Sequence, residues 1–441
     1  MSCICCFFDP QRQFSLKRRT FSDLRFEDRL EKYKNVYLDE IDSLSSVKNC
    51  NCKYARISKK YPLFKNTTDE MLKIIKNDKV SISSFFQSFI NIYIDYITNG
   101  AYQAINKFSD FLIKEDLITG RSISPIEYNQ LLFRARPKEA QWFTENDLFH
   151  VPFSLRCKIS NQRFSVSGQP MLYLTKSIIT AKKELDKDFD KLQFAAFVPN
   201  YSYYYDKKIF NLSHYIYDSI VKTLPALCGG TCKDLGPNID LFDIRNIKRE
   251  IMTNILMFPC NTTLSLKIEK KSFTEEYVLP QMFTSIIENN SFAGIEYPSS
   301  KINSSIYDEH LFSDYNKNVA FFVKYQKANN FDMDLRNSFL MLMQDQSGIG
   351  NITLEQVKTK LYKIKAPQDG NNYNDWIIPI AKTQRHLEDL ENAKIDKEYY
   401  FNTKEGKLEL FFMMKLCREM KQRIKYWQLL MNSYATLWGS F

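Results

Sequence analysis

The segment that decides the fold reads LFRARP at 132–137, NQRFSVSGQP at 161–170 and MLYLTKSIITAKKEL at 171–185. Its apolar runs are short and rich in Leu, Phe and Tyr, as buried strands are. A turn of small residues and proline precedes the last run, and Ser177 is a suitable N-cap for the helix that follows. The segment predicts a strand, a turn, a second strand and a helix. Three charged side chains would gather near one short strand: Arg134, Arg163 and Glu184.

Short strands and helices continue through the middle of the chain, and this mixture is typical of an α+β fold. We expect strands over 192–198, 264–268 and 319–325, and a helix over 279–288. We expect three parts: a mainly helical N-terminal region (1–116) with a cysteine cluster, a central β core with helices (117–330), and a helical C-terminal extension (331–441).

The N-terminal region carries clear helix signals. Residues 67–70, TTDE, resemble a capping box. Apolar residues recur at helical spacing from Phe85 to Ile97, before the stop signal Asn99-Gly100. The C-terminal region should end in a long amphipathic helix whose basic face is most simply a solvated one.

The composition limits the classes of function that are possible but does not select one of them. The chain has 441 residues, 44% hydrophobic residues and a formal charge of +10, which describes a folded protein that could meet nucleic acid, an anionic small molecule or an acidic partner. Since we find no apolar stretch of ~20 residues and no secretory signal, we expect a cytoplasmic protein without a membrane span. Ten cysteines at irregular spacing then indicate reduced thiols rather than a disulfide framework.

Several enzyme classes lack their motifs. The chain contains neither a P-loop nor the Gly-x-Gly-x-x-Gly of a dinucleotide-binding fold. The four histidines stand at positions that do not suit a shared metal ion or a catalytic triad: His150, His214, His310 and His386.

Two cysteine pairs near the N-terminus could hold a structural zinc ion. The four thiols belong to a Cys-x-x-Cys and a Cys-x-Cys pair, namely Cys3, Cys6, Cys50 and Cys52. Because the second pair is closer than the usual spacing, thiols without a metal remain the alternative. Cys228 and Cys232 flank a glycine turn and are more simply incidental.

The charged residues of the deciding segment combine with a later run, FAGIEYPSS at 292–300, into an ordered set. An early aromatic-Arg, a Gln-Arg-Phe-Ser turn followed by Gly-x-Pro, a Tyr-Leu strand, a helix with Glu and a distant Pro-Ser-Ser occur in this order. The set resembles the RES domain family, over about residues 131–315. The chain is most similar to the long members with cysteine-containing N-terminal regions.

The resemblance implies a core similar to ADP-ribosyltransferases and a toxin that consumes NAD and is neutralised by an antitoxin or immunity protein. Carried over by residue, Arg134 matches the first Arg of the family, Arg163 the turn Arg, Glu184 the helix Glu, and Ser299 or Ser300 the final Ser. The chain departs from the family pattern at Ala135, where Tyr is frequent, and at the Asn-Gln before Arg163, where Gly-Gly is usual.

The same residue types suit the cleavage of NAD even without the resemblance to a family. Cleavage of the nicotinamide–ribose bond passes through a sugar cation, which a carboxylate such as Glu184 stabilises. Arg134 and Arg163 would hold the pyrophosphate through paired charge-assisted bonds. Tyr173 or Phe164 would stack on nicotinamide, and the hydroxyl of Ser299 or Ser300 would bond the substrate. Singly, such residues are more often surface ion pairs, solvated acids or core aromatics.

The sequence therefore predicts an NAD-degrading toxin or defence effector. Two alternatives remain open. One is an ADP-ribosyltransferase that modifies a specific macromolecule. The other is a catalytically degenerate nucleic-acid-binding or assembly protein that uses its positive charge.

Overall fold

The computed structural model describes residues 2–20, 25–118, 122–123, 131–200, 207–212, 244–261, 273–299, 301, 315–346, 350–365, 373–395 and 397–438. The chain divides into two compact units. The first is formed by Met1–Ser122, Ser160–Ser167 and Phe210–Asn290, and the second by Ile123–Ile159, Gly168–Ile209 and Ser291–Phe441.

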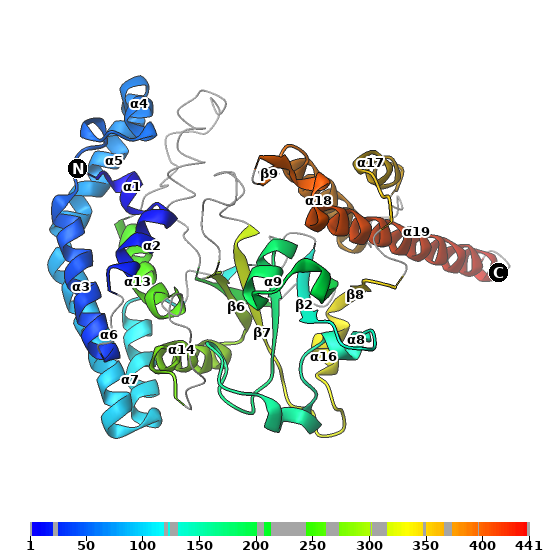
Figure 1. The fold of residues 1–441 in the computed structure, drawn as a ribbon, viewed down its shortest axis with the longest axis horizontal. Coiled ribbons are helices and arrows are strands. Elements are labelled where there is room, and N and C mark those ends of the chain that lie inside the picture. Colours follow the sequence, from blue (N-terminus) through cyan, green and yellow to red (C-terminus); the bar gives the residue numbers. More distant parts are fainter. Residues whose placement is uncertain are drawn as a thin grey trace. The chain divides into compact units, whose positions relative to one another are not determined.

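The first unit is helical. Its helices are α1 (Ile4–Phe7), α2 (Pro10–Arg18), α3 (Phe26–Ser43), α4 (Lys53–Lys60), α5 (Pro62–Asn77), α6 (Lys79–Asn99), α7 (Ala101–Lys114), α13 (Ile244–Asn261) and α14 (Val278–Asn289). Figure 1 shows α13 and α14 beside the blue and cyan helices of the N-terminal region. The helices join because each buries one apolar face.

Aromatic rings form much of the core of this unit. Tyr33 of α3 stacks on Phe258 of α13 with ring centroids 4.2 Å apart and contacts Phe86 of α6 edge-on. The predicted apolar stripe of α6 is confirmed from Phe85 to Tyr93, and its helix ends at Asn99, where Gly100 takes a positive φ of 88°. A glycine suits that helix end because it adopts this conformation without strain.

The second unit is built on a sheet. Its strands are β2 (Leu132–Pro137), β3 (Met171–Thr175), β4 (Leu192–Pro199), β6 (Phe292–Pro298), β7 (Lys317–Phe322) and β8 (Phe339–Met343). They lie in the order β6-β7-β3-β2-β4-β8, and each neighbouring pair is antiparallel. The full sheet order begins with β1 (Ser122–Ile123) and β5 (Lys208–Asn211), which come before β6. The boundary between the two units falls within each of these two strands.

Each face of this sheet carries its own core. Alternate residues of β4 enter different clusters, with Ala196 packed among the residues of α9 (Ile178–Leu185) and α19 (Lys404–Trp438). Its neighbour Ala195 packs on the opposite face, with residues of α8 (Glu145–Leu148) and α16 (Met333–Asn337). This follows from the two-residue period of a strand, which sends successive side chains to opposite faces.

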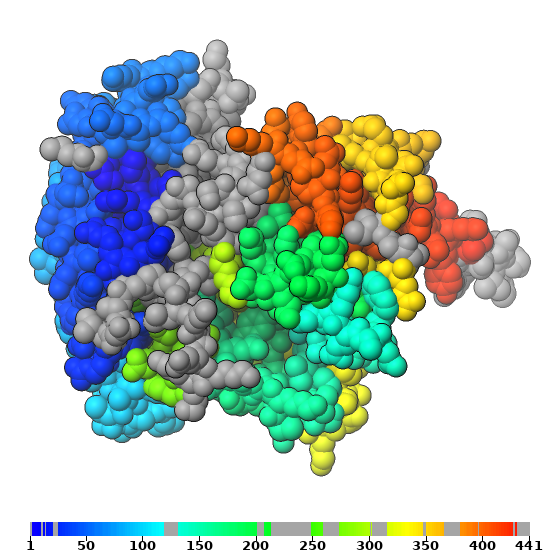
Figure 2. Space-filling model, viewed as in Figure 1, coloured from blue at the N-terminus to red at the C-terminus, as the bar shows by residue number. Residues whose placement is uncertain are grey.

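The C-terminal helices belong to the α9 face. The helices α17 (Leu354–Tyr362) and α18 (Tyr373–Glu391) contribute buried residues to the same core as α19. Figure 2, in the same view, shows α17 and α18 in yellow and orange along the red α19. The long C-terminal helix expected from sequence is therefore present.

The α+β prediction is confirmed. The division into units differs from the three expected parts, because α13 and α14 join the N-terminal helices and the C-terminal helices join the sheet. The strand expected over 264–268 lies outside the described residues. Among the residues that the structure describes, no helix combines the length and apolarity that a membrane crossing needs.

Candidate active site

Glu184 lies in the last turn of α9, directly after β3. The hydroxyl of Ser177 caps the start of this helix by accepting a hydrogen bond from the amide of Thr180 at 3.0 Å, as predicted. A carboxylate near the C-terminal end of a helix opposes the helix dipole, which favours cations there. The position of Glu184 is therefore not explained by the stability of α9, and such local conflicts concentrate at functional sites.

The carboxylate of Glu184 is held by two donors from the sheet. The hydroxyl of Ser299, directly after β6, donates to Oε1 at 2.8 Å, and Nδ2 of Asn318 on β7 donates to the same oxygen at 2.6 Å. Both partners are buried, whereas Glu184 is half-buried. The predicted pair Glu184 and Ser299 is thus brought together within one unit, although the two residues are far apart in the chain.

This arrangement leaves acceptors for a ligand. Both protein bonds fall on Oε1 of Glu184, so Oε2 has no protein donor among the described residues. Oδ1 of Asn318 is buried and likewise accepts no hydrogen bond from any residue that the structure describes. A buried polar atom without a partner is costly, so Oδ1 of Asn318 favours a ligand that donates a hydrogen bond to it. Oε2 of the half-buried Glu184 can accept a second bond, so the two acceptors suit a ligand with several hydroxyl groups, such as a sugar.

Backbone contacts fix the residues around the carboxylate. The amide of Ser299 donates to the carbonyl of Asn316 at 2.7 Å, and the hydroxyl of Ser299 accepts from the amide of Lys301 at 3.2 Å. Nζ of Lys301 donates to the backbone carbonyl of Glu184 at 2.5 Å. Ser299 is therefore held from three sides, which preorganises its hydroxyl.

Tyr173 lies on the same face of the sheet as Asn318. It pairs with Ala320 of β7, and Asn318 stands two residues earlier on that strand, so all three side chains share the face that α9 covers. The ring of Tyr173 is half-buried and its hydroxyl contacts Sδ of Met171 at 3.7 Å. Tyr173 keeps the exposure that a stacking role requires. Figure 2 shows the segment of α9 at the surface in this view.

Arg134 lies on the other face of the sheet, and the expectation that it shares a pocket with Glu184 is wrong. On β2 it alternates with Phe133, which packs on the α9 face, and its guanidinium donates to the carbonyl of Phe149 at 2.7 Å on the opposite side. Burial, with a contribution from Arg136, lowers the pKa of Arg134 to about 10, so it stays charged at neutral pH. The local sequence around Arg134 did not determine which face the arginine would take.

Arg163 and Phe164 belong to the first unit, in a tight turn closed by the amide of Gln162 to the carbonyl of Ser165 at 2.8 Å. Nε2 of Gln281 on α14 donates to the backbone carbonyl of Gln162 at 2.8 Å and to that of Ser165 at 3.1 Å. The ring of Phe164 is fully buried, so stacking on a ligand does not fit its observed place. Arg163 is half-buried, and its approach to Glu184 stays a prediction.

Two residues of the site, Asn318 and Lys301, were not predicted from the sequence, and one predicted residue, Ser300, is not described by the structure. Asn318 and Lys301 contact Glu184 or its helix, yet neither stands in a motif. The signal available for Asn318 was a polar residue at the start of an apolar strand. Ser300 lies outside the described residues, so Ser299 is the serine that the structure places beside the carboxylate.

A separate cleft of about 530 Å³ opens elsewhere in the second unit. It is lined by aromatic and basic residues that include Phe153, Arg156, Tyr325 and Lys327. Glu184, Ser299 and Asn318 do not line it. The candidate active site is therefore defined by hydrogen bonds around one carboxylate and not by this cleft.

Comparison with known proteins adds one relative. No family model and no solved structure matches the chain. A curated protein of Bacillus subtilis (strain 168), named "Putative toxin YopC", is 29% identical over 252 residues. The match covers 53% of this chain and 52% of that protein, so the chain spans about half the length of the curated relative it matches. The chain is thus similar to a protein that is named as a toxin.

Proposed function

We propose that this protein is a toxin that breaks the nicotinamide–ribose bond of NAD, with Glu184 as the central catalytic residue. The observation that carries the proposal is the carboxylate of Glu184, held on Oε1 by Ser299 and Asn318 and open on Oε2. The similarity to a protein named as a toxin supports the biological role. The order of Arg163, Glu184 and Ser299 in the RES-like segment supports the choice of NAD.

The chemistry requires a fixed negative charge beside a sugar. As nicotinamide leaves, positive charge develops on the ribose, and a carboxylate held at one position stabilises that charge without having to reorganise. Ser299 and Asn318 would keep Glu184 in this position through Oε1, which leaves Oε2 to bond the ribose hydroxyls. Contacts to a sugar hydroxyl that strengthen as the bond breaks lower the barrier further.

The remaining parts of NAD need other residues. Tyr173, half-buried on the same sheet face, is the candidate to stack on the nicotinamide ring. A guanidinium suits the pyrophosphate, because it forms two parallel charge-assisted bonds to phosphate oxygens, and the RES-like sequence order is what names Arg163 for this role. Arg134 has no role at this site in the proposal, since it lies on the opposite sheet face.

The test is release of nicotinamide from NAD by the purified full-length protein. Glu184→Gln, which keeps the size of the side chain and removes its charge, should lower the rate by at least about 100-fold. The matched control is Glu405→Gln, because Glu405 bonds Lys182 on the same helix α9 at 2.7 Å but does not contact Ser299 or Asn318. The control should keep the wild-type rate. Wild-type protein that leaves NAD intact in the presence of phosphate and of cell extract would refute the proposal.

Product analysis then identifies the acceptor of the ADP-ribose. Free ADP-ribose indicates hydrolysis, a phosphorylated product indicates phosphorolysis, and label on protein or nucleic acid indicates ADP-ribosyl transfer. A toxin of this kind would act in the cytoplasm, where it depletes NAD, and a host that carries it would need an antitoxin or immunity protein. Expression of the wild type but not of Glu184→Gln should therefore stop growth.

A further inference from the structure

The four N-terminal cysteines of the first unit come from two segments of the chain. Cys3 directly precedes the short helix α1 and Cys6 lies within it, while Cys50 and Cys52 lie between the 3-10 turn Val47–Asn49 and helix α4. The segments run side by side, because Cys3 forms a parallel bridge with Ser45 and the amide of Ser45 donates to the carbonyl of Ser2 at 2.9 Å. Two backbone stretches thus present their thiols to one point.

The spacing of the sulfur atoms is that of ligands around a single ion. Sγ of Cys3 lies 3.7 Å from Sγ of both Cys6 and Cys52, and Sγ of Cys6 lies 3.8 Å from Sγ of Cys50. All four sulfurs lie within 4.8 Å of one another. Thiolates placed about 2.3 Å from one ion at the corners of a tetrahedron lie about 3.8 Å apart.

Disulfides, an iron–sulfur cluster and metal-free thiols each fit these sulfur positions less well than a single ion does. A disulfide would bring two sulfurs to about 2.05 Å, and none of the four cysteines forms one with any residue that the structure describes. An iron–sulfur cluster binds its thiolates to different irons, which spreads the sulfurs further apart than one shared ion does. Buried thiols without a metal have no reason to converge from two segments, since each alone behaves as a small apolar group.

We propose that Cys3, Cys6, Cys50 and Cys52 bind one structural zinc ion. Four thiolates around zinc form a closed site without an open position for substrate, so the ion holds the fold and takes no part in NAD cleavage. Lys48 and Lys53 flank the second pair in the sequence and offset the net negative charge of such a site. The inference is independent of the proposed function, because the cysteines and Glu184 belong to different units.

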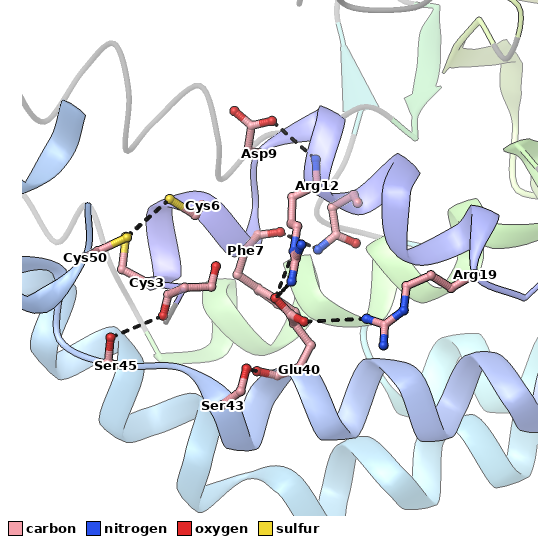
Figure 3. A network of polar contacts seen from close by, with 12 residues as sticks. Cys3, Cys6, Phe7, Asp9, Arg12, Arg19, Glu40, Ser43, Ser45 and Cys50 are labelled. Atoms are coloured by element: carbon pink, nitrogen blue, oxygen red, sulfur yellow. Dashed lines mark hydrogen bonds and ion pairs between the residues drawn. The ribbon is translucent and has the colours of Figure 1, made fainter. Parts of the chain in front are cut away.

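The ion would fasten the first residues of the chain to the helices that follow. Figure 3 shows Cys3, Cys6 and Cys50 close to the pair formed by Arg12 of α2 and Glu40 of α3, whose Nε and Oε1 lie 2.9 Å apart. This pair and apolar contacts, such as the edge-on contact between the rings of Phe7 and Tyr37, join short helices that would be marginal in isolation. A metal ion bound here bridges a loop of more than 40 residues between Cys6 and Cys50. Because the unfolded chain lacks the preformed site, the free energy of metal binding adds to the free energy of folding.

The test measures the metal content of the purified full-length protein and of its cysteine variants. The wild type should contain close to one zinc ion per chain, and Cys6→Ser and Cys50→Ser should lose most of it. The matched control is Cys5→Ser, since Cys5 lies between two ligands in the sequence and is more deeply buried than Cys6 and Cys50 but is not part of the cluster. The control should keep its zinc. Cys52→His should also keep it, because zinc accepts three thiolates and one imidazole.

Wild-type measurements cover the case in which the serine variants do not fold. Protein refolded with cobalt should show the absorption bands of tetrahedral cobalt with four thiolates, and zinc should displace them. A chelator should lower the Tm of the wild type. Zinc absent after refolding in excess zinc, zinc retained by both serine variants, or iron bound in its place would overturn the proposal.

Discussion

The hydroxyl of Ser299 donates a hydrogen bond to Oε1 of Glu184 at 2.8 Å, across 115 positions of the chain. This contact joins the end of the first helix after β3 to the residue that follows β6. Because Asn318 donates to the same oxygen, the carboxylate cannot rotate without losing two bonds. The pair therefore gives Glu184 one orientation, which is what a group that must meet a developing charge needs.

Ser299 should act by positioning Glu184. We expect Ser299→Ala to lower the kcat of nicotinamide release by about 10- to 100-fold, with a much smaller change in KM, because a loosely held carboxylate still admits substrate. Ser299→Thr, which keeps the hydroxyl, should retain most of the activity. Steady-state kinetics of both variants check this.

The control for that experiment is Ser285→Ala, at an exposed serine on α14 that bonds the carbonyl of Gln281 within its own helix. It should leave kcat unchanged. An equal loss of activity in Ser299→Thr and Ser299→Ala would show that the hydroxyl is not what matters.

Arg134 should contribute to stability and not to catalysis. Its half-buried guanidinium donates to the carbonyl of Phe149, so we expect Arg134→Lys to lower the free energy of unfolding by roughly 1–3 kcal/mol. Nicotinamide release per folded molecule should change by less than about twofold, because Arg134 and Glu184 face opposite sides of the sheet. Denaturant unfolding and kinetics on the same preparation separate the two effects. A folded variant without activity would contradict this placement.

Glu296 should make the fold sensitive to acid. Its fully buried carboxylate pairs with Nζ of Lys176 at 2.6 Å and of Lys317 at 3.5 Å. Burial alone would raise the pKa of Glu296, but the two lysines outweigh it and the pKa falls below its ordinary value of 4.5. Its contribution to stability is thus complete above pH 4.5 and is lost as the pH falls through the lowered pKa.

We therefore expect Glu296→Gln to lower the free energy of unfolding by about 3–5 kcal/mol at neutral pH, because two buried lysines lose the negative charge that faces them. Below pH 4.5 the wild type should lose more stability than the variant. Asp188→Asn, which removes an exposed pair with Lys191, should leave stability almost unchanged. Equal slopes of stability against pH for wild type and Glu296→Gln would refute the assignment.

A buried polar network should hold the C-terminal helices together. Glu409 of α19 contacts Nε2 of His386 on α18 and accepts a hydrogen bond from the hydroxyl of Tyr400, while Tyr315 contacts Nδ1 of His386 at 3.2 Å. Glu409→Ala removes the carboxylate that contacts Nε2 of His386 and the hydroxyl of Tyr400, and it should cost on the order of 3 kcal/mol. Glu409→Gln keeps the shape and most bonds, so it should cost clearly less. Chemical denaturation of both variants measures the difference.

Much of the fold could be predicted because local signals agreed with the final structure. Helix α6 followed from its apolar spacing and from Gly100, and α9 followed from Ser177. The capping box expected at 67–70 is wrong, because α5 begins earlier, at Pro62, and Thr68 bonds the carbonyl of Phe64 within the helix. Pro62, at the first position of α5, marks the start of this helix more reliably than the capping-box pattern does.

The candidate site could be predicted only in part. Glu184 and Ser299 were named from their order in a motif, and the structure brings them together. Asn318 could not be named, because its role depends on the register of β7 against β6 and β3, which residues far apart in the sequence decide. The face taken by Arg134 depends on the same kind of pairing, since a shift of one residue reverses every side chain of a strand.

The strand β4, which lies between β2 and the edge strand β8, contributes to two cores on opposite sides of the sheet, through Ala195 on one side and Ala196 on the other. Although these alanines are covalent neighbours, enlarging either one strains a different set of partners. Evolution can thus remodel the surroundings of Glu184 while leaving the packing behind Arg134 untouched.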